Sequence, residues 1–408
     1  MKQFSIPSKY RSPLITAIKS KRKEADKLKK DFSPTQLDFD TVAFKLARHF
    51  GFCYGVENAI EIAFQTIEQY PDRRIFLLSE MIHNPFVNED LINRGLQFMM
   101  DTKGNTLIPF ETLTQEDIVI IPAFGTTIEI ENKLKSIGIQ IERYNTTCPF
   151  VEKVWNRAEQ IASKGYSIVV HGKPSHEETR ATFSHSNVHA PTIVVNDMQE
   201  AIVLGDCIIG KYTSAECYRL FSGRYSEGFD FERDLQKFGV VNQTTMLATD
   251  TQAIADYLKN IIIQKYQLSA SNVNEHFADT RDTLCYATND NQTAVIHLLK
   301  EPADLAIVIG GRKSSNSSHL VELCEEKLPT YFIQSEEDIL SPNKIRCFNW
   351  RTHEEYIAEN FLPSDKKPVI AITSGASCPD AIVENVVAKI SSYFTNGRVM
   401  EQIVAQWT

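Results

Sequence analysis

Three cysteines occupy the same kind of position in this chain, where an apolar run or a loop gives way to an amphipathic segment. Cys148 lies in NTTCPF (145–150), Cys53 in GFCYGV (51–56) and Cys285 in DTLCYAT (282–288). From Cys53 onward, short apolar runs alternate with amphipathic segments, a pattern typical of parallel sheets covered by helices. We therefore expect an α/β protein in which each cysteine begins a new unit.

The spacing of the cysteines indicates a repeat. The chain from Cys53 to Cys148 is about as long as that from Cys285 to Cys378, whereas the interval between Cys148 and Cys285 is longer. An irregular stretch near 205–238, rich in aromatic, charged and glycine residues, accounts for the excess as a surface insertion. The 408 residues also exceed the length at which one core stops growing, roughly 250–300 residues. We expect three similar α/β units with small parallel sheets in a pseudo-three-fold arrangement.

The predicted domains follow from these boundaries. They are an N-terminal extension (1–45), a first unit (46–147), a second unit (148–284) containing the insertion, a third unit (285–378), and a C-terminal helix and tail (379–408). The basic run at 19–30 contains Glu24 and Asp26 and differs from a targeting peptide, so residues 1 to about 40 are expected to form a solvated helical extension.

Charge and hydropathy exclude several classes of partner. The net charge of -9 gives no general attraction to nucleic acid or to an anionic membrane. The sequence has no run near the roughly 18 apolar residues that a membrane span requires. We expect a cytoplasmic protein without nucleic-acid or membrane partners.

The cysteine content favours reduced thiols. Eight cysteines in a chain of this length are not the disulfide framework of a short secreted domain. They form no Cys-x-x-Cys pair, so a metal site would have to be assembled from distant ligands. Taken singly, each cysteine is more typical of a buried core position.

Small hydroxyl residues follow two of the expected strands. The runs SSNS (314–317) and GASCPD (375–380) each lead into a helix. Helix amino ends carry unpaired N–H groups and a partial positive charge, which suits phosphate groups. A lone Ser-Ser-Asn is also an ordinary helix cap, so this pattern alone leaves both interpretations open.

Taken together, the motifs resemble the LytB family over about residues 46–395. They are GFCYGV (51–56), HNP (83–85), TCP (147–149), HEET (176–179), NQTT (242–245), DTLCYAT (282–288), SSNS (314–317) and GAS (375–377). The form HGK followed by HEET is similar to the plant and cyanobacterial branch. Members of the family are 4-hydroxy-3-methylbut-2-enyl diphosphate reductases of the non-mevalonate (MEP/DOXP) isoprenoid pathway.

The resemblance implies a cofactor and a set of site residues. Cys53, Cys148 and Cys285 match the ligands of one [4Fe-4S] cluster per chain, around which the three units would be arranged, and three thiolates leave one iron open. Glu178 matches the glutamate that relays a proton to the substrate hydroxyl, with His176 and Thr244 as its catalytic neighbours. The implied substrate contacts are His83, His176, Thr244, Ser314, Ser315, Asn316 and Ser377.

The implied reaction is the reductive dehydroxylation of (E)-4-hydroxy-3-methylbut-2-enyl diphosphate to isopentenyl and dimethylallyl diphosphate. The substrate hydroxyl would bind the open iron, and two electrons would come from ferredoxin or flavodoxin. A non-redox dehydratase and a cluster-based sensor are the alternatives. Two positions depart from the family pattern: Phe124 stands where many bacterial members have histidine, and Cys378 follows Ser377, where a helix-start role is the better interpretation.

Overall fold

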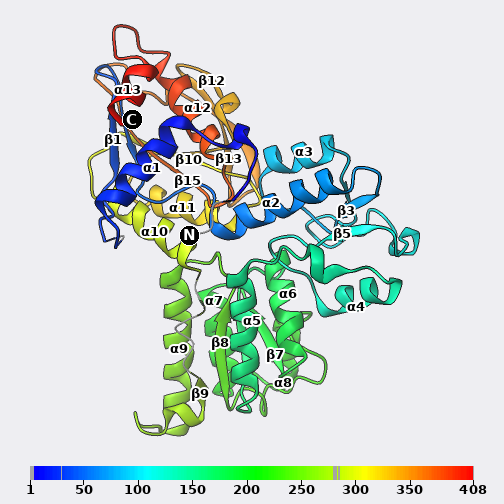
Figure 1. Cartoon of the computed structure of the whole chain (residues 1–408). Helices are drawn as coiled ribbons and strands as arrows, with labels where there is room; N and C mark the ends of the chain where they lie inside the picture. Colours follow the sequence, from blue (N-terminus) through cyan, green and yellow to red (C-terminus); the bar gives the residue numbers. More distant parts are fainter. Residues whose placement is uncertain (1–3, 29, 279–282, 284, 408) are drawn as a thin grey trace. The chain divides into compact units, whose positions relative to one another are not determined.

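The structure is a computed structural model that describes residues 4–28, 30–278, 283 and 285–407. It confirms the expected α/β class, because small parallel sheets are covered by helices (Figure 1). The chain forms two compact units, each assembled from separate segments. Unit 1 comprises Met1–Glu57, His83–Asn88 and Tyr286–Thr408, and unit 2 comprises Asn58–Ile82 and Glu89–Cys285. The predicted three-unit division and its pseudo-three-fold arrangement around a cluster stay predictions.

Unit 1 contains a five-stranded sheet in the order β1-β2-β15-β10-β11. Strands β2, β15, β10 and β11 are parallel, and β1 is antiparallel to β2. The run LAIVI of β10 is buried at every position, as expected for a strand that is covered on both faces. The strands are β1 (Thr35–Asp38), β2 (Ala43–Leu46), β10 (Leu305–Ile309), β11 (Thr330–Ile333) and β15 (Val369–Ser374).

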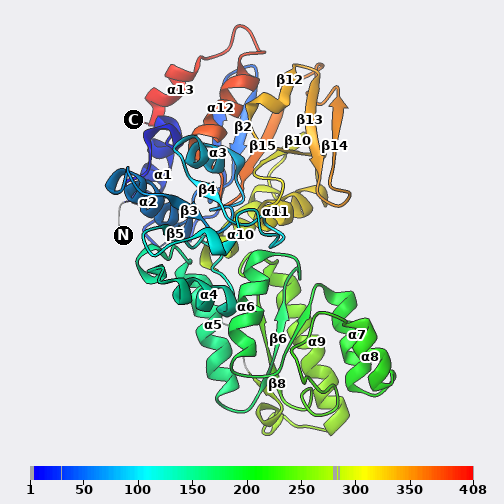
Figure 2. The same ribbon diagram turned by 90° about the vertical axis from the view of Figure 1, so that its right-hand side faces the viewer.

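Helices and a second sheet complete unit 1. The antiparallel strands β12 (Ile339–Ser341), β13 (Lys344–Asn349) and β14 (Glu354–Glu359) form the second sheet (Figure 2). The helices are α1 (Pro13–Ala25), α10 (Tyr286–Leu298), α11 (Ser315–Glu325), α12 (Asp380–Ser391) and α13 (Met400–Trp407), with 3-10 turns at η1 (Ser8–Tyr10) and η5 (Glu336–Asp338).

The N-terminal segment is not the solvated extension that the sequence led us to expect. Helix α1 is present, but Leu14, Ile15 and Ile18 are buried in the core, and the helix packs against α12 and α13. The prediction of full exposure was based on the charged residues of the run at 19–30. Its apolar residues instead form one buried side, and the polar residues occupy the other.

Unit 2 contains two parallel sheets, β4-β3-β5 and β7-β6-β8-β9. Helices α5 and α6 cover one face of the second sheet, while α7 and α9 pack together on the other (Figure 2). The strands are β3 (Ile75–Leu77), β4 (Gln97–Phe98), β5 (Ile118–Ile120), β6 (Ser167–His171), β7 (Thr192–Val195), β8 (Phe238–Asn242) and β9 (Phe277–Ala278).

The helices of unit 2 follow these strands in the chain. They are α4 (Ile128–Ile137), α5 (Pro149–Ala162), α6 (Glu177–Asn187), α7 (Met198–Ile208), α8 (Ser214–Leu220) and α9 (Ala248–Tyr266), with 3-10 turns at η2 (Phe110–Thr112), η3 (Ile141–Tyr144) and η4 (Val273–Glu275). Helices α2 (Tyr54–Gln69) and α3 (Pro85–Asn93) each include residues of both units. Among the described residues, we find no helix with the length and apolar character needed to cross a membrane.

The stretch near 205–238 is part of the core of unit 2, which corrects the prediction of a surface insertion. It contains the end of α7 and all of α8, and Phe221, Phe229 and Phe231 are 1%, 3% and 4% exposed. A disulfide joins Cys207 of α7 to Cys217 of α8. The expectation of reduced thiols is therefore wrong for this pair.

Candidate functional site

Three adjacent parallel strands of unit 1 deliver predicted site residues to one edge of the sheet. Loops leave the carboxyl ends of β2, β15 and β10, where open α/β sheets bind their ligands. The Cys53 N–H donates to the Ala376 carbonyl at 3.2 Å, and the Ala376 N–H donates to Asn316 Oδ1 at 3.0 Å. These bonds join the loops that carry Cys53, Ser377 and Asn316.

The start of α11 combines a helix cap with unsatisfied polar atoms. Ser314 caps the helix by accepting the Ser317 N–H at 3.2 Å. The next two residues, Ser315 and Asn316, are each 3% exposed. Of the residues described in this structure, Ser315 Oγ and Asn316 Nδ2 are among the buried atoms without a hydrogen-bond partner. Because an unsatisfied buried polar group costs about 1–3 kcal/mol, such atoms at a helix amino end fit an oxygen-rich anionic ligand.

His83 lies against the same loops in unit 1. Its carbonyl accepts a hydrogen bond from Ser377 Oγ at 3.3 Å. A Cβ added to Gly311 would collide with this carbonyl, so the glycine permits the close approach of the two backbones. Sequence reasoning missed Gly311; the signal was the Gly-Gly pair between β10 and the SSNS run.

Glu178, His176 and Thr244 meet at the carboxyl edge of the β6–β8 pair in unit 2. His176 caps α6, and its Nδ1 accepts the Glu178 N–H at 3.2 Å. Glu178 is only 1% exposed, and its Oε1 accepts the Thr244 N–H at 2.5 Å. The structure therefore brings these three predicted residues together, because β6 and β8 are neighbours and run parallel.

Gln243 joins the loop after β8 to the loop after β6 and to the start of α6, and sequence reasoning did not single it out. Its Oε1 accepts from the Lys173 N–H at 3.1 Å and from Thr179 Oγ1 at 2.9 Å, and its N–H donates to the His171 carbonyl at 2.8 Å. The NQTT run contained this residue. Its partners lie about 65 residues away in sequence, however, so local patterns could not identify them.

Phe124 contacts the ring of His176. The two ring centres are 5.5 Å apart at an interplanar angle of 85°, an edge-to-face arrangement that is favourable for aromatic pairs. The residue that departs from the bacterial pattern therefore packs on a predicted site residue.

The three predicted ligand cysteines lie at helix starts. Cys53 precedes α2, Cys148 is the N-cap of α5, and Cys285 precedes α10. The Cys148 N–H donates to the Ala123 carbonyl at 3.0 Å. Thr283, which lies two residues before Cys285, donates from Oγ1 to Asn242 Oδ1 at 2.6 Å. Asp282 and Leu284 of the DTLCYAT motif lie outside the described residues.

Three other cysteines, Cys324, Cys347 and Cys378, lie in the core. Burial raises the pKa of Cys324, Cys347 and Cys378 to about 12, so these groups stay protonated at neutral pH. Cys378 is fully buried, which agrees with a helix-start packing role. In the part of the chain that is described, no three His, Cys, Asp or Glu side chains form a ready metal site.

These features define a class of protein: an α/β protein whose polar and thiol side chains gather where parallel strands end and helices begin. The LytB protein model matches residues 44–391, and the chain belongs to this family.

Named relatives and solved structures agree with this assignment. The chain is 40% identical to 4-hydroxy-3-methylbut-2-enyl diphosphate reductase of a strain of Prochlorococcus marinus, over 87% of this chain and 85% of the relative. It is 39% identical to the protein of the same name from Crocosphaera subtropica, over 86% and 84% of the two chains. Solved reductase structures share the fold. One, described as the terminal enzyme of the non-mevalonate pathway, has a TM-score of 0.52 at 24% identity, over 85% of this chain and 98% of that chain. The one from Plasmodium falciparum has a TM-score of 0.62 at 21% identity, over 88% and 90%.

Proposed function

We propose that this chain converts (E)-4-hydroxy-3-methylbut-2-enyl diphosphate into isopentenyl diphosphate and dimethylallyl diphosphate, the last step of the non-mevalonate pathway. Relatives with the corresponding name match the chain over most of its length. The observation that carries the proposal is the pair of buried, unsatisfied polar atoms at the start of α11, Ser315 Oγ and Asn316 Nδ2. A substrate diphosphate would supply the acceptor oxygens that these groups require.

The residues of unit 1 are proposed to bind the diphosphate. Ser314, Ser315, Asn316 and Ser377 supply hydroxyl and amide groups, and the amino end of α11 adds N–H groups and a partial positive charge. The bond from Ser377 Oγ to the His83 backbone carbonyl supports a role for His83 beside them. A neutral pocket of this kind binds phosphate through many hydrogen bonds rather than through arginine side chains.

Glu178 is proposed to deliver the proton that lets the substrate hydroxyl leave as water. The Thr244 N–H fixes its carboxyl group, and burial keeps bulk water from competing for the proton. Because His176 Nδ1 accepts the Glu178 N–H, the neutral imidazole carries its proton on Nε2 and is a hydrogen-bond donor there. His176 and Thr244 thus orient the acid and offer polar contacts to the substrate.

Cys53, Cys148 and Cys285 are proposed to hold one [4Fe-4S] cluster. LytB enzymes are iron–sulfur proteins, and these three residues fit because each lies at a helix start, where the positive end of the helix favours a thiolate. The bound cluster would supply two electrons one at a time and an iron with an open coordination position. Its reductant is proposed to be ferredoxin or flavodoxin, and the cytoplasm stays the predicted location.

A reduced-dye assay tests the function. Anaerobic protein with its iron restored is mixed with reduced methyl viologen and the allylic diphosphate, while dye oxidation and diphosphate products are followed together. Dye consumption of two electrons per product molecule would support the reductase. Product formation without dye oxidation would indicate a dehydratase, and neither signal in iron-loaded protein would indicate a sensor.

A further inference from the structure

Lys19 of α1 ties the N-terminal segment to the loop that carries Cys53. Its Nζ donates to the Phe50 carbonyl at 3.0 Å and to Asp380 Oδ1 at 2.7 Å. The same ammonium lies 4.7 Å from the centre of the Phe50 ring. Phe50 is three residues before Cys53, and Asp380 begins α12 just after the Ser377 loop. One side chain therefore joins α1 to the loop that carries Cys53 and to the start of α12.

The Cys53 loop is packed directly on this ion pair. Gly51 has a φ of 76°, which favours glycine, and a Cβ at this position would collide with Asp380 Oδ1 and lie 3.1 Å from Lys19 Nζ. The space beside the backbone is thus filled by the pair itself. A side chain at position 51 would therefore have to displace the pair.

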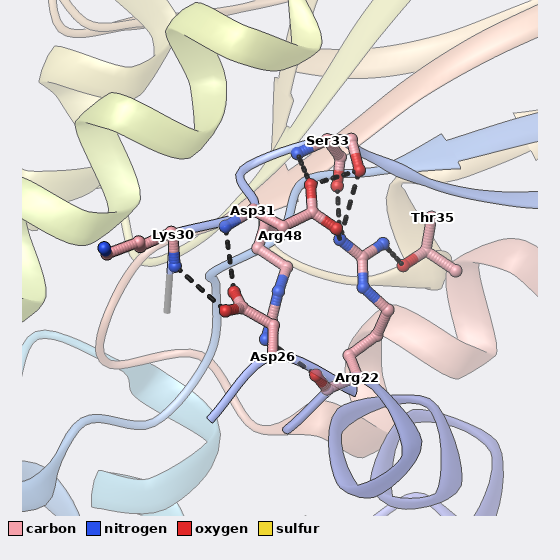
Figure 3. Close-up of polar contacts among 7 residues, drawn as sticks. All are labelled: Arg22, Asp26, Lys30, Asp31, Ser33, Thr35 and Arg48. Carbon is pink, nitrogen blue, oxygen red and sulfur yellow. Dashed lines mark hydrogen bonds and ion pairs between the residues drawn. The ribbon is translucent and has the colours of Figure 1, made fainter. Parts of the chain in front are cut away.

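A second tether lies at the other end of the same loop. Arg48 Nη2 donates to the Arg22 carbonyl at 3.3 Å, which links the loop to the last turn of α1. Arg22 is held in turn by Asp31 at 2.9 Å and by Thr35 at 3.1 Å, the polar network shown in Figure 3. The segment before Cys53 is therefore held by α1 at both ends.

A cavity of about 270 Å³ lies beside these tethers, and Lys19, Arg48 and Cys53 all line it. Asp380 neutralises the Lys19 ammonium, so the side chain fixes the backbone rather than adding net charge near the thiol. Within unit 1, the N-terminal helix thus shapes the immediate surroundings of Cys53.

We propose that Lys19 is a positioning residue for Cys53, and that the N-terminal segment serves to hold this cysteine in the orientation in which it ligates iron. The inference rests on the proposed role of Cys53 as a cluster ligand. It assigns a role in the site to a part of the chain that precedes every motif of the family resemblance.

The test compares Lys19→Met with Lys21→Met in the full chain. Lys21 is a matched control, because it also tethers α1, through the Gln406 carbonyl at 3.1 Å, but it contacts α13 rather than the Cys53 loop. Iron release from the anaerobic holoenzyme to a ferrous chelator is timed. The labelling of Cys53 and Cys148 by iodoacetamide is measured by mass spectrometry of their peptides, both during release and in the chelator-stripped chain. Melting temperature is recorded for each variant.

In Lys19→Met we expect iron release and Cys53 labelling to accelerate about fivefold or more, the effect of losing hydrogen bonds made by a charged group. Cys148 labelling in the chelator-stripped chain should stay unchanged, Lys21→Met should match wild type, and Lys19→Arg should restore most of the slow rate. Equal acceleration in Lys19→Met and Lys21→Met, or wild-type rates in Lys19→Met, would overturn the proposal.

Two further outcomes keep the test decisive. If Lys19→Met does not fold, Asp380→Asn takes its place, because it removes the ion pair but keeps the Phe50 contact. This variant should give a smaller acceleration of Cys53 labelling. No acceleration would count against the proposal. If the chain holds no iron at all, the proposed cluster fails. Faster Cys53 labelling in iron-free Lys19→Met would then still show that Lys19 positions the cysteine.

Discussion

Replacing Ser315 with alanine should separate substrate affinity from stability. Ser315 Oγ is buried and is among the described atoms without a partner, so the free protein bears a desolvation cost of about 1–3 kcal/mol for this hydroxyl. Ser315→Ala removes that cost, and the free energy of unfolding should stay the same or rise by up to about 1 kcal/mol. The bound diphosphate would lose a hydrogen bond to a charged group, worth about 1.5–3 kcal/mol, which weakens affinity about 10- to 100-fold.

Ser318 on the same helix is the control, because its replacement should change stability but not diphosphate affinity. Its Oγ donates to the Ser314 carbonyl at 3.1 Å, so Ser318→Ala should lower the free energy of unfolding by about 0.5–1 kcal/mol. Its hydroxyl is already satisfied, and diphosphate affinity should change less than about threefold. Urea unfolding and calorimetric titration with the substrate diphosphate measure both quantities for the two variants. Equal affinities for Ser315→Ala and wild type would refute the reasoning that α11 cradles the diphosphate.

Further predictions test the acid, the ligands and the core. Glu178→Gln keeps the acceptor for the Thr244 N–H but removes the proton. Anaerobic turnover at equal iron content should therefore fall about 10²- to 10⁴-fold, with little change in substrate affinity. The control is Glu177→Gln: Glu177 is the neighbouring residue and is bonded to Ser79, and this variant should lose far less turnover. Cys53→Ser, Cys148→Ser and Cys285→Ser should each lose iron and the brown absorbance, whereas Cys324→Ser and Cys347→Ser should keep both; full iron in Cys148→Ser would disprove its role. Phe231→Ala should lower the free energy of unfolding by about 3–5 kcal/mol, because this ring is buried in the core of unit 2, and a cost below about 1 kcal/mol would restore the idea of a surface insertion.

The sequence was most informative where a strand, a loop and a helix follow one another directly. The runs after β6, β10 and β15 begin helices, so the positions of Glu178, Ser314 and Ser377 at sheet edges could be predicted from local order alone. Contacts made across the chain could not. The bond from Thr179 to Gln243 depends on which strands become neighbours, and the pairing of Lys19 with Asp380 depends on the packing of α1 against α12. No spacing rule encodes either choice.

Two of the corrections, for the stretch near 205–238 and for the disulfide, have identifiable physical causes. The stretch near 205–238 lacks a helical or strand period over much of its length, and this irregularity suggested a loop. Its phenylalanines nonetheless carry large apolar surfaces that are stable only when buried, and Phe221, Phe229 and Phe231 fill the core with largely irregular backbone. For Cys207 and Cys217, the pairing follows from the packing of α7 against α8, which a spacing in sequence does not reveal.

Phe124 shows how a departure from a family pattern can keep part of a site intact. A histidine at this position could hydrogen-bond a phosphate oxygen, and phenylalanine cannot. The edge-to-face contact with His176 instead restricts the imidazole whose Nδ1 accepts the Glu178 N–H. Such a contact is worth about 0.5–1.5 kcal/mol beyond burial, similar to one neutral hydrogen bond. Phe124 therefore has no hydrogen-bonding group to offer a phosphate, while its ring contact adds rigidity to the histidine that orients the proposed acid.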